Sequence, residues 1–125
     1  MIKRFKNGSY EIAYLTQGKG RDILFLHGFP SNMYMWDEIT SVLSHQDYRT
    51  TVMEQRGYPL SSSKTMSPND FTIDKLCEDV EILIKNLDLN NKLTIVGHDW
   101  GTVVAWAVVK RNKAVSYTHL RAHET

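Results

Sequence analysis

Gly97-His98-Asp99-Trp100-Gly101 decides the fold of this chain, because it places an acidic residue between two glycines in the pattern G-x-Asp-x-G. The four residues before it, 93–96, form an apolar, β-branched run, and a helical stretch from residue 102 to residue 111 follows. A strand, a sharp turn and a helix in this order lift one side chain above the end of a sheet, and small flanking residues permit the strained turn. The pattern therefore predicts that Asp99 stands above the end of a strand.

The central position of this motif is where a nucleophile is expected, and an aspartate there changes the chemistry. A carboxylate is poorly suited to attack an amide. It can displace a leaving group at a saturated carbon and form an alkyl-enzyme ester. Asp99 is therefore the candidate catalytic residue, and the expected substrate is a small molecule with such a leaving group.

The composition indicates one ordinary soluble globular domain: 125 residues, of which 42% are hydrophobic and 23% charged. The formal net charge of +1 gives no reason to expect nucleic acid or an anionic membrane as a partner. Cys77 is the single cysteine, so no internal disulfide is possible and a reducing compartment is expected. No apolar run approaches the roughly 20 residues of a membrane span. We therefore expect a cytoplasmic protein, and nothing in the sequence indicates its oligomeric state.

Predicted strands and helices alternate along the chain. An antiparallel hairpin turns at Asn7-Gly8, where both residues tolerate positive φ. Apolar stripes predict a helix over residues 33–43 and another over residues 73–87, the second capped by Thr72. Buried strands are predicted over residues 22–26, 48–53 and 93–96. This order predicts an α/β fold, with a mostly parallel sheet preceded by the hairpin and flanked by helices.

Three motifs, taken together, resemble a known family. They are His27-Gly28-Phe29-Pro30, Gln55-Arg56-Gly57-Tyr58 and Gly97-His98-Asp99-Trp100-Gly101. In order and spacing they resemble the α/β-hydrolase fold family, and most closely its epoxide hydrolase and haloalkane dehalogenase branch. The resemblance extends from about residue 10 to residue 114. It implies that residues 1–114 are the N-terminal portion of an α/β-hydrolase core.

The resemblance also implies roles for individual residues. Asp99 matches the nucleophile, and the backbone N–H groups of Phe29 and Trp100 match the two donors of an oxyanion hole. Phe29 and Trp100 are also expected to line the substrate pocket, whereas Trp36 either lines it or packs in the core. The structural positions of the motifs are His27, Gly28, Pro30, Gly97 and Gly101, and the Phe29–Pro30 bond is expected to be cis. Neither a cofactor nor a metal is implied.

Two residues bear on the choice of substrate. Dehalogenases of this branch tend to carry Asn where this chain has Phe29, and they use it with the Trp after the nucleophile to hold halide. Trp100 is present and the Asn is absent, so opening of an epoxide is favoured over displacement of a halide. The alternatives are a haloalkane dehalogenase or another hydrolase of the same fold, and a half-fold that binds without catalysis.

The family's second loop usually reads Asp-x-Arg-Gly-x-Gly, whereas this chain has Glu54 for the Asp and Pro59 for the second Gly. Proline fixes φ and removes an N–H, so the loop is expected to take a different path after Tyr58.

Residues 115–125 depart from the pattern of alternating strands and helices. This segment is polar and resembles the in-frame translation of a sequencing-library adapter, so we expect it to be a non-native tail. In this fold the catalytic acid and histidine follow the nucleophile along the chain. They would lie beyond residue 114, so the chain as given is expected to be an inactive fragment.

Overall fold

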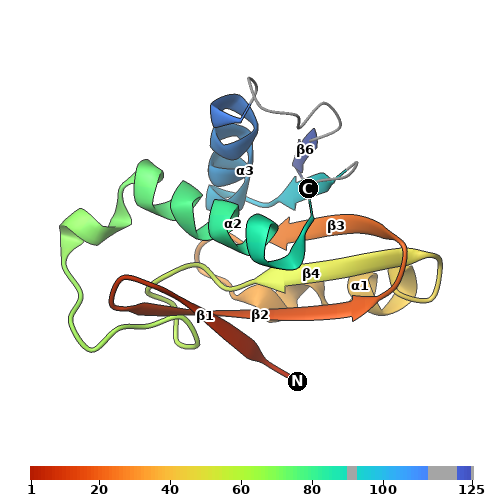
Figure 1. Ribbon diagram of the computed structural model, residues 1–125, viewed down its shortest axis with the longest axis horizontal. Coiled ribbons are helices and arrows are strands. Elements are labelled where there is room, and N and C mark those ends of the chain that lie inside the picture. The colour runs from red at the N-terminus through yellow and green to blue at the C-terminus, as the bar shows by residue number, and fades with distance from the viewer. Residues whose placement is uncertain (90–92, 113–120, 125) are drawn as a thin grey trace.

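The computed structural model describes residues 1–89 and 93–112, together with the backbone of residues 121–124. Its elements follow one another along the chain as labelled in Figure 1. They are β1 (Lys3–Asn7), β2 (Tyr10–Gly18), β3 (Arg21–Leu26), η1 (Met33–Trp36), α1 (Asp37–Leu43), β4 (Tyr48–Met53), η2 (Pro68–Phe71), α2 (Ile73–Leu87), β5 (Thr94–Gly97), α3 (Trp100–Arg111) and β6 (Arg121–Glu124).

The strands form one mixed sheet in the order β1-β2-β4-β3-β5-β6. Strands β1 and β2 pair antiparallel, as do β2 and β4, whereas β4, β3, β5 and β6 run parallel to one another. The predicted α/β class, with a mostly parallel sheet and an antiparallel N-terminal hairpin, is confirmed. Gly8 turns the hairpin with φ of 62°, a conformation that glycine adopts without steric cost.

The parallel arrangement brings the three sequence motifs to one edge of the sheet. In the register of β3 with its two neighbours, Leu26 pairs with Met53 on one side and with Gly97 on the other. Each of the three motifs begins at or just after the strand end that these residues mark. Ligand sites of open α/β sheets lie at the carboxyl ends of the strands, so this edge is where a functional site is expected.

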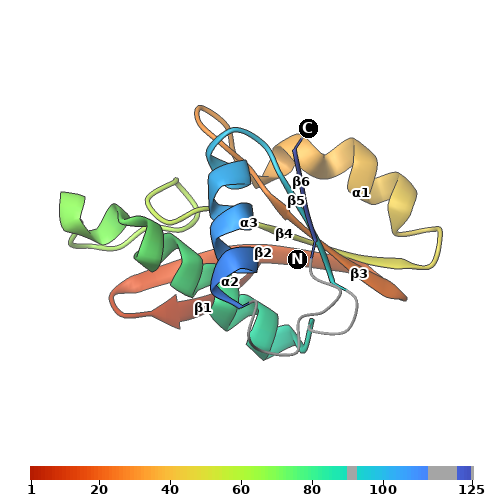
Figure 2. The ribbon, with the colours of Figure 1, turned by 90° about the horizontal axis from the view of Figure 1, so that it is seen from above.

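Alternate residues of the central strands fill two separate cores. Leu24 and Leu26 pack with α2 and α3 on one face, whereas Phe25 packs with η1 on the other. Figures 1 and 2 show α2 and α3 on one side of the sheet and α1 on the opposite side. Coverage of both faces explains why β3 is apolar over consecutive residues, as expected for a buried parallel strand.

Helix α2 begins and ends with residues suited to helix termini. The Thr72 side chain accepts a hydrogen bond from the Lys75 backbone N–H, as the prediction of an N-cap requires, and Asp88 closes the helix in the left-handed conformation. The helix buries its apolar stripe, including Val80, Leu83 and Ile84, against the sheet and α3. Burying each of these side chains contributes about 1.5–3 kcal/mol.

The single helix predicted over residues 33–43 is wrong in detail. The segment forms the 3-10 helix η1 followed by α1, and several residues of the expected buried stripe are exposed, among them Ile39 and Val42. Trp36 of the expected stripe is buried, together with Met33 and Thr40, which lay outside it. A 3-10 turn advances three residues per turn rather than 3.6, which rotates the buried face relative to the helical pattern.

A buried ion pair joins the loop after β4 to α2. Arg56 Nε and Nη2 donate to the two carboxylate oxygens of Asp79, each at 2.7 Å, and both side chains are almost fully buried. Asn7 Nδ2 donates to Asp79 Oδ1 at 2.8 Å, and Arg56 Nη1 donates to the Asp70 carbonyl at 3.0 Å. The network therefore links the N-terminal hairpin, η2 and α2 behind the Arg56 loop.

The prediction that regular strands and helices end after residue 114 is wrong for residues 121–124. Their backbone forms β6, which pairs in parallel with β5 along its whole length, from Thr94 with Arg121 to Gly97 with Glu124. Without β6, β5 would leave a row of N–H and C=O groups unpaired, and such an edge accepts a strand with little regard to side chains. Residues 115–120 and 125 of the predicted non-native tail lie outside the described residues, and the pairing does not test the origin of the tail.

Candidate active site

The turn between β5 and α3 holds Asp99 in a strained backbone conformation. Its φ of 57° and ψ of −120° lie outside the regions that L-residues favour, at a cost of about 1–3 kcal/mol. Two turn hydrogen bonds stabilise this geometry: Gly101 N donates to the His98 carbonyl, and Thr102 N to the Asp99 carbonyl, each at 2.9 Å. The turn lifts the Asp99 side chain into an exposed position, as the motif predicted.

Two glycines allow the turn to approach the neighbouring strand end closely. A Cβ on Gly101 would collide with the Leu26 carbonyl oxygen, and a Cβ on Gly28 would collide with Asp99 and with the His98 carbonyl oxygen. His98 N also donates to the Leu26 carbonyl at 3.1 Å. The glycines of two separate motifs are therefore needed at these positions because their backbones meet beside Asp99.

The Asp99 carboxylate lies against the two backbone amides that the resemblance assigned to an oxyanion hole. Phe29 N donates to Asp99 Oδ2 at 3.1 Å, and the Trp100 amide also hydrogen-bonds the carboxylate. These two bonds, the one from Phe29 first, hold the pKa of Asp99 below its ordinary value. The carboxylate is therefore ionised at neutral pH, which is the form a nucleophile requires.

His27 fixes the loop that carries the Phe29 amide. Its Nε2 accepts a hydrogen bond from Gln55 N at 2.9 Å, and its Nδ1 lies 2.9 Å from the Gly28 carbonyl oxygen, to which it must donate. Both contacts are satisfied by one neutral tautomer. The ring is fully buried, and burial lowers its pKa. His27 thus ties the end of β3 to the loop after β4, as its predicted structural role requires.

A cis peptide bond and the buried carboxylate of Glu54 shape the rest of the loop after β3. The Phe29–Pro30 peptide bond is cis, as predicted. Glu54 accepts hydrogen bonds from Met33 N at 3.3 Å and from Leu60 N at 2.7 Å. The Glu54 carboxylate therefore joins the segment after Pro30 to the loop after Tyr58.

Two consecutive turns shape the loop that contains the departure at Pro59. Tyr58 N donates to the Gln55 carbonyl at 3.2 Å with Gly57 at φ of 88°, and Ser61 N donates to the Tyr58 carbonyl at 2.8 Å. Pro59 occupies the second position of the latter turn, where its fixed φ is suitable and its missing N–H is not needed. Tyr58 is shared by the two turns. Its ring packs edge-on against the His27 ring, with the ring centroids 4.5 Å apart.

A pocket of about 500 Å³ opens beside the Asp99 turn. Phe29 and Trp100, which flank the carboxylate, both line it and remain 67% and 54% exposed, so both predicted pocket residues are accessible there. The other lining residues are Gln55, Arg56, Tyr58, Phe71, Thr72, Ile73, Leu76 and Val104. The sequence singled out Gln55, Arg56 and Tyr58 as part of a motif without assigning them to a pocket. It gave no signal for the residues of α2.

Trp36 does not line this pocket, and that part of the pocket prediction is corrected. Its side chain is 4% exposed and packs against Phe25, with ring centroids 5.0 Å apart. It lies in the core between the sheet and η1, because the 3-10 turn directs it inward. The alternative reading, core packing, is the one that the structure supports.

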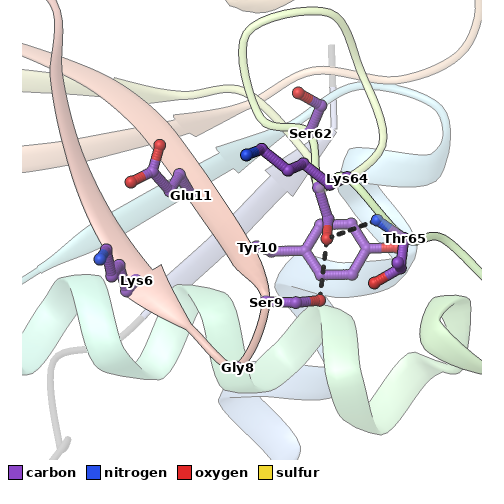
Figure 3. Close-up of a pocket in the computed structure, with 9 residues that line it drawn as sticks. Lys6, Gly8, Ser9, Tyr10, Glu11, Ser62, Lys64 and Thr65 are labelled. Atoms are coloured by element: carbon purple, nitrogen blue, oxygen red, sulfur yellow. Dashed lines mark hydrogen bonds between the residues drawn. The ribbon is translucent and has the colours of Figure 1, made fainter.

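A second, more polar hollow of about 570 Å³ lies between the N-terminal hairpin and residues 62–65 (Figure 3). Lys6, Glu11 and Lys64 line it. Ser9 and Ser63 also line it, and Ser63 Oγ donates to Ser9 Oγ at 2.9 Å. None of the predicted site residues lines this hollow.

The described residues hold no group of three or more His, Cys, Asp and Glu side chains that could bind a metal ion. None of the helices in the described part of the chain is long and apolar enough to cross a bilayer. The sole thiol, Cys77, is buried on α2, and burial raises its pKa. Among the described residues, the candidate site at the Asp99 turn therefore consists of one carboxylate and two backbone amide donors beside an apolar pocket.

A model of the alpha/beta hydrolase fold matches residues 23–116, and the chain belongs to this family. Epoxide hydrolase 3 of Xenopus tropicalis is 33% identical over 119 residues, which cover 94% of this chain and 31% of that protein. AB hydrolase superfamily protein YfhM of Bacillus subtilis (strain 168) is 39% identical over 95 residues, covering 76% of this chain and 32% of that protein.

Solved structures of epoxide hydrolases also resemble this chain. The structure of potato (Solanum tuberosum) epoxide hydrolase I superposes with a TM-score of 0.83 at 29% identity, covering 90% of this chain and 36% of that chain. The predicted resemblance to the epoxide hydrolase branch is thus confirmed. The chain spans about a third of the length of the relatives that it matches.

Proposed function

We propose that the protein to which this chain belongs is an epoxide hydrolase in which Asp99 is the nucleophile. The observation that carries this proposal is the exposed, ionised Asp99 carboxylate, held by a strained turn against the amides of Phe29 and Trp100. The names of the relatives support an epoxide as the substrate.

The reaction proceeds in two steps. In the first, an Asp99 oxygen attacks a ring carbon, the ester C–O bond forms, and the ring C–O bond breaks with its electron pair passing to oxygen, which takes up a proton. In the second, water attacks the ester carbonyl and gives up a proton, and the Phe29 and Trp100 amides stabilise the oxyanion that develops there. The oxyanion then collapses, the bond between the carbonyl carbon and the alkoxy oxygen breaks, and that oxygen takes up a proton, which releases the diol and restores the Asp99 carboxylate. Loss of one such donor raises a barrier by roughly 3 kcal/mol in oxyanion holes of this kind.

The second step needs a base to activate water. In this fold the acid and the histidine follow the nucleophile along the chain, and the chain covers only about a third of the length of its relatives. We therefore propose that this chain alone forms the ester and does not turn over.

Halide displacement is the runner-up, because Trp100 follows the nucleophile as it does in dehalogenases. Phe29 argues against it, since its side chain has no hydrogen-bond donor for a halide ion. An epoxide needs no halide site, so the same pocket suits it better. A non-catalytic binding role stays the third alternative, and it is tested by the same experiment.

The test is turnover by a full-length protein that contains this chain, compared with its Asp99→Asn variant. An amide is a far weaker nucleophile than a carboxylate, so hydrolysis of an epoxide is expected to stop while folding is retained. Undiminished turnover, with the side chain shown by mass spectrometry still to be amide, would remove Asp99 from this role. Hydrolysis of a chloroalkane in preference to an epoxide would favour the runner-up.

The foreign origin of residues 115–125 is also a proposal, supported by their resemblance to adapter sequence. A long sequencing read of the source DNA through the Ala114 codon tests it. A read that continues into a different coding sequence after Ala114 supports a non-native tail, whereas one that encodes residues 115–125 contradicts it.

A further inference from the structure

We propose that the pocket between the start of α2 and the Asp99 turn receives a bulky apolar substituent of the epoxide, and that Ile73 and Leu76 limit the size of that substituent. This inference rests on the proposed function, because it assigns the part of the substrate that does not react. It makes α2, which no motif marked, the element that determines specificity.

The position of the pocket carries the inference. Phe29 and Trp100 form one wall, and their backbone amides hold the carboxylate of Asp99, so this wall of the pocket lies next to the attacking group. Ile73 and Leu76 stand on the first turn of α2 and are half-buried, with their remaining surface available to the pocket. A substrate with its ring carbon at Asp99 can therefore extend its substituent towards α2.

The lining is chemically suited to an aromatic ring or a branched alkyl group. Phe29, Phe71 and Trp100 supply three aromatic faces or edges, and Ile73, Leu76 and Val104 supply aliphatic surface. Aromatic rings pack favourably edge-on or offset against one another, and burial of apolar surface favours binding. Small-molecule sites are usually concave and apolar with a few polar groups, and this pocket has that composition.

One of those polar groups has no partner in the described residues. Gln55 is 4% exposed, and its Oε1 atom accepts no hydrogen bond there, although its Nε2 donates to the His27 carbonyl at 3.4 Å. A buried acceptor without a partner is costly. Rotation of the Gln55 side chain towards the pocket would let this oxygen accept from the hydroxyl group that opening of the ring creates.

The experiment measures ester formation at Asp99 in the 125-residue chain with two epoxides of different size. Propylene oxide carries a methyl group, and styrene oxide carries a phenyl ring. Adducts are followed by intact mass and assigned by peptide mapping, and only the adduct that disappears in Asp99→Asn is counted. The variants are Leu76→Trp and Ile73→Trp, which fill the pocket, and Val42→Trp, which adds the same ring to an exposed position of α1 on the opposite face.

The proposal predicts that each filling variant lowers the rate with styrene oxide at least about tenfold relative to propylene oxide, whereas Val42→Trp changes neither rate more than about twofold. An unchanged ratio in both filling variants would overturn it. Absence of any Asp99 adduct from either epoxide in the unaltered chain would overturn the proposed function instead.

A second measurement needs no variant. Unreactive 2-phenylethanol is titrated into the unaltered chain, and the methyl NMR signals of Ile73, Leu76 and Val104 are compared with those of Ile39 and Val42. Shifts confined to the first three support the pocket, even where ester formation fails. Equal shifts in both groups, or none, would contradict it.

Discussion

Replacing Arg56 with methionine tests whether the buried network behind the site holds the fold together. The change removes both 2.7 Å bonds to Asp79 and the 3.0 Å bond to the Asp70 carbonyl, and it leaves a carboxylate that is 0% exposed with Asn7 as its neutral partner. Removing one member of a buried ion pair typically costs about 3–5 kcal/mol, because the other charge stays buried without compensation. We expect a loss of this size in the free energy of unfolding.

The assay is urea denaturation followed by far-ultraviolet circular dichroism. With a slope of about 2 kcal/mol/M, a loss of about 4 kcal/mol moves the midpoint by roughly 2 M. Arg111→Met is the matched control, since its pairs with Asp74 and Glu81 are partly open to solvent, unlike the Arg56–Asp79 pair, and such pairs contribute about 0–1 kcal/mol. The double variant Arg56→Met with Asp79→Leu is expected to recover much of the loss, because no buried charge is left. Equal midpoints for Arg56→Met and Arg111→Met would refute the reasoning.

Two further predictions concern the loops at the carboxyl ends of the strands. Gly101→Ala drives a methyl group into the Leu26 carbonyl and should cost at least about 3 kcal/mol. In Gly8→Ala the Cβ meets nothing within 4 Å, so the cost is only the strain of an alanine at φ of 62°, about 1–2 kcal/mol, and thermal unfolding compares the two. His27 has a lowered pKa in the folded protein, so the unfolded chain binds its proton more readily, and the free energy of unfolding should fall as the pH decreases below about 6.5. His27→Gln keeps an acceptor for Gln55 N and does not titrate, so it should flatten this dependence; an unaltered pH profile would contradict the assignment.

Much of the fold could be predicted because its signals are local and strong. Strand β4 matches the predicted range, and α2 begins after its predicted cap, Thr72, because caps and periodic apolar stripes are written in neighbouring residues. The segment that begins at Met33 was predicted less well. Its apolar residues fit a helical stripe, but tertiary packing selected a 3-10 turn that buries Trp36 and exposes Ile39. Backbone pairing of β6 was not foreseen either, since an open strand edge accepts a partner largely through its backbone.

The Asp99 turn was easier to predict than the pocket beside it. Motifs identify the Asp99 turn, the Phe29 loop and His27, because strained turns and close backbone approaches demand particular residues such as Gly28 and Gly101. No strained turn or close backbone approach requires particular residues at the positions of Ile73 and Leu76. In sequence they look like ordinary members of an amphipathic stripe, and only the packing of α2 against the turn makes them walls of a pocket.

The most direct test of the central claim is to locate the adduct that forms when the 125-residue chain is incubated with propylene oxide. Peptide mapping by tandem mass spectrometry should find one base-labile ester on Asp99, and the Asp99→Asn chain should lack it while its other minor adducts are unchanged. The same adducts in both chains, with none on Asp99, would contradict the assignment of this carboxylate as the nucleophile.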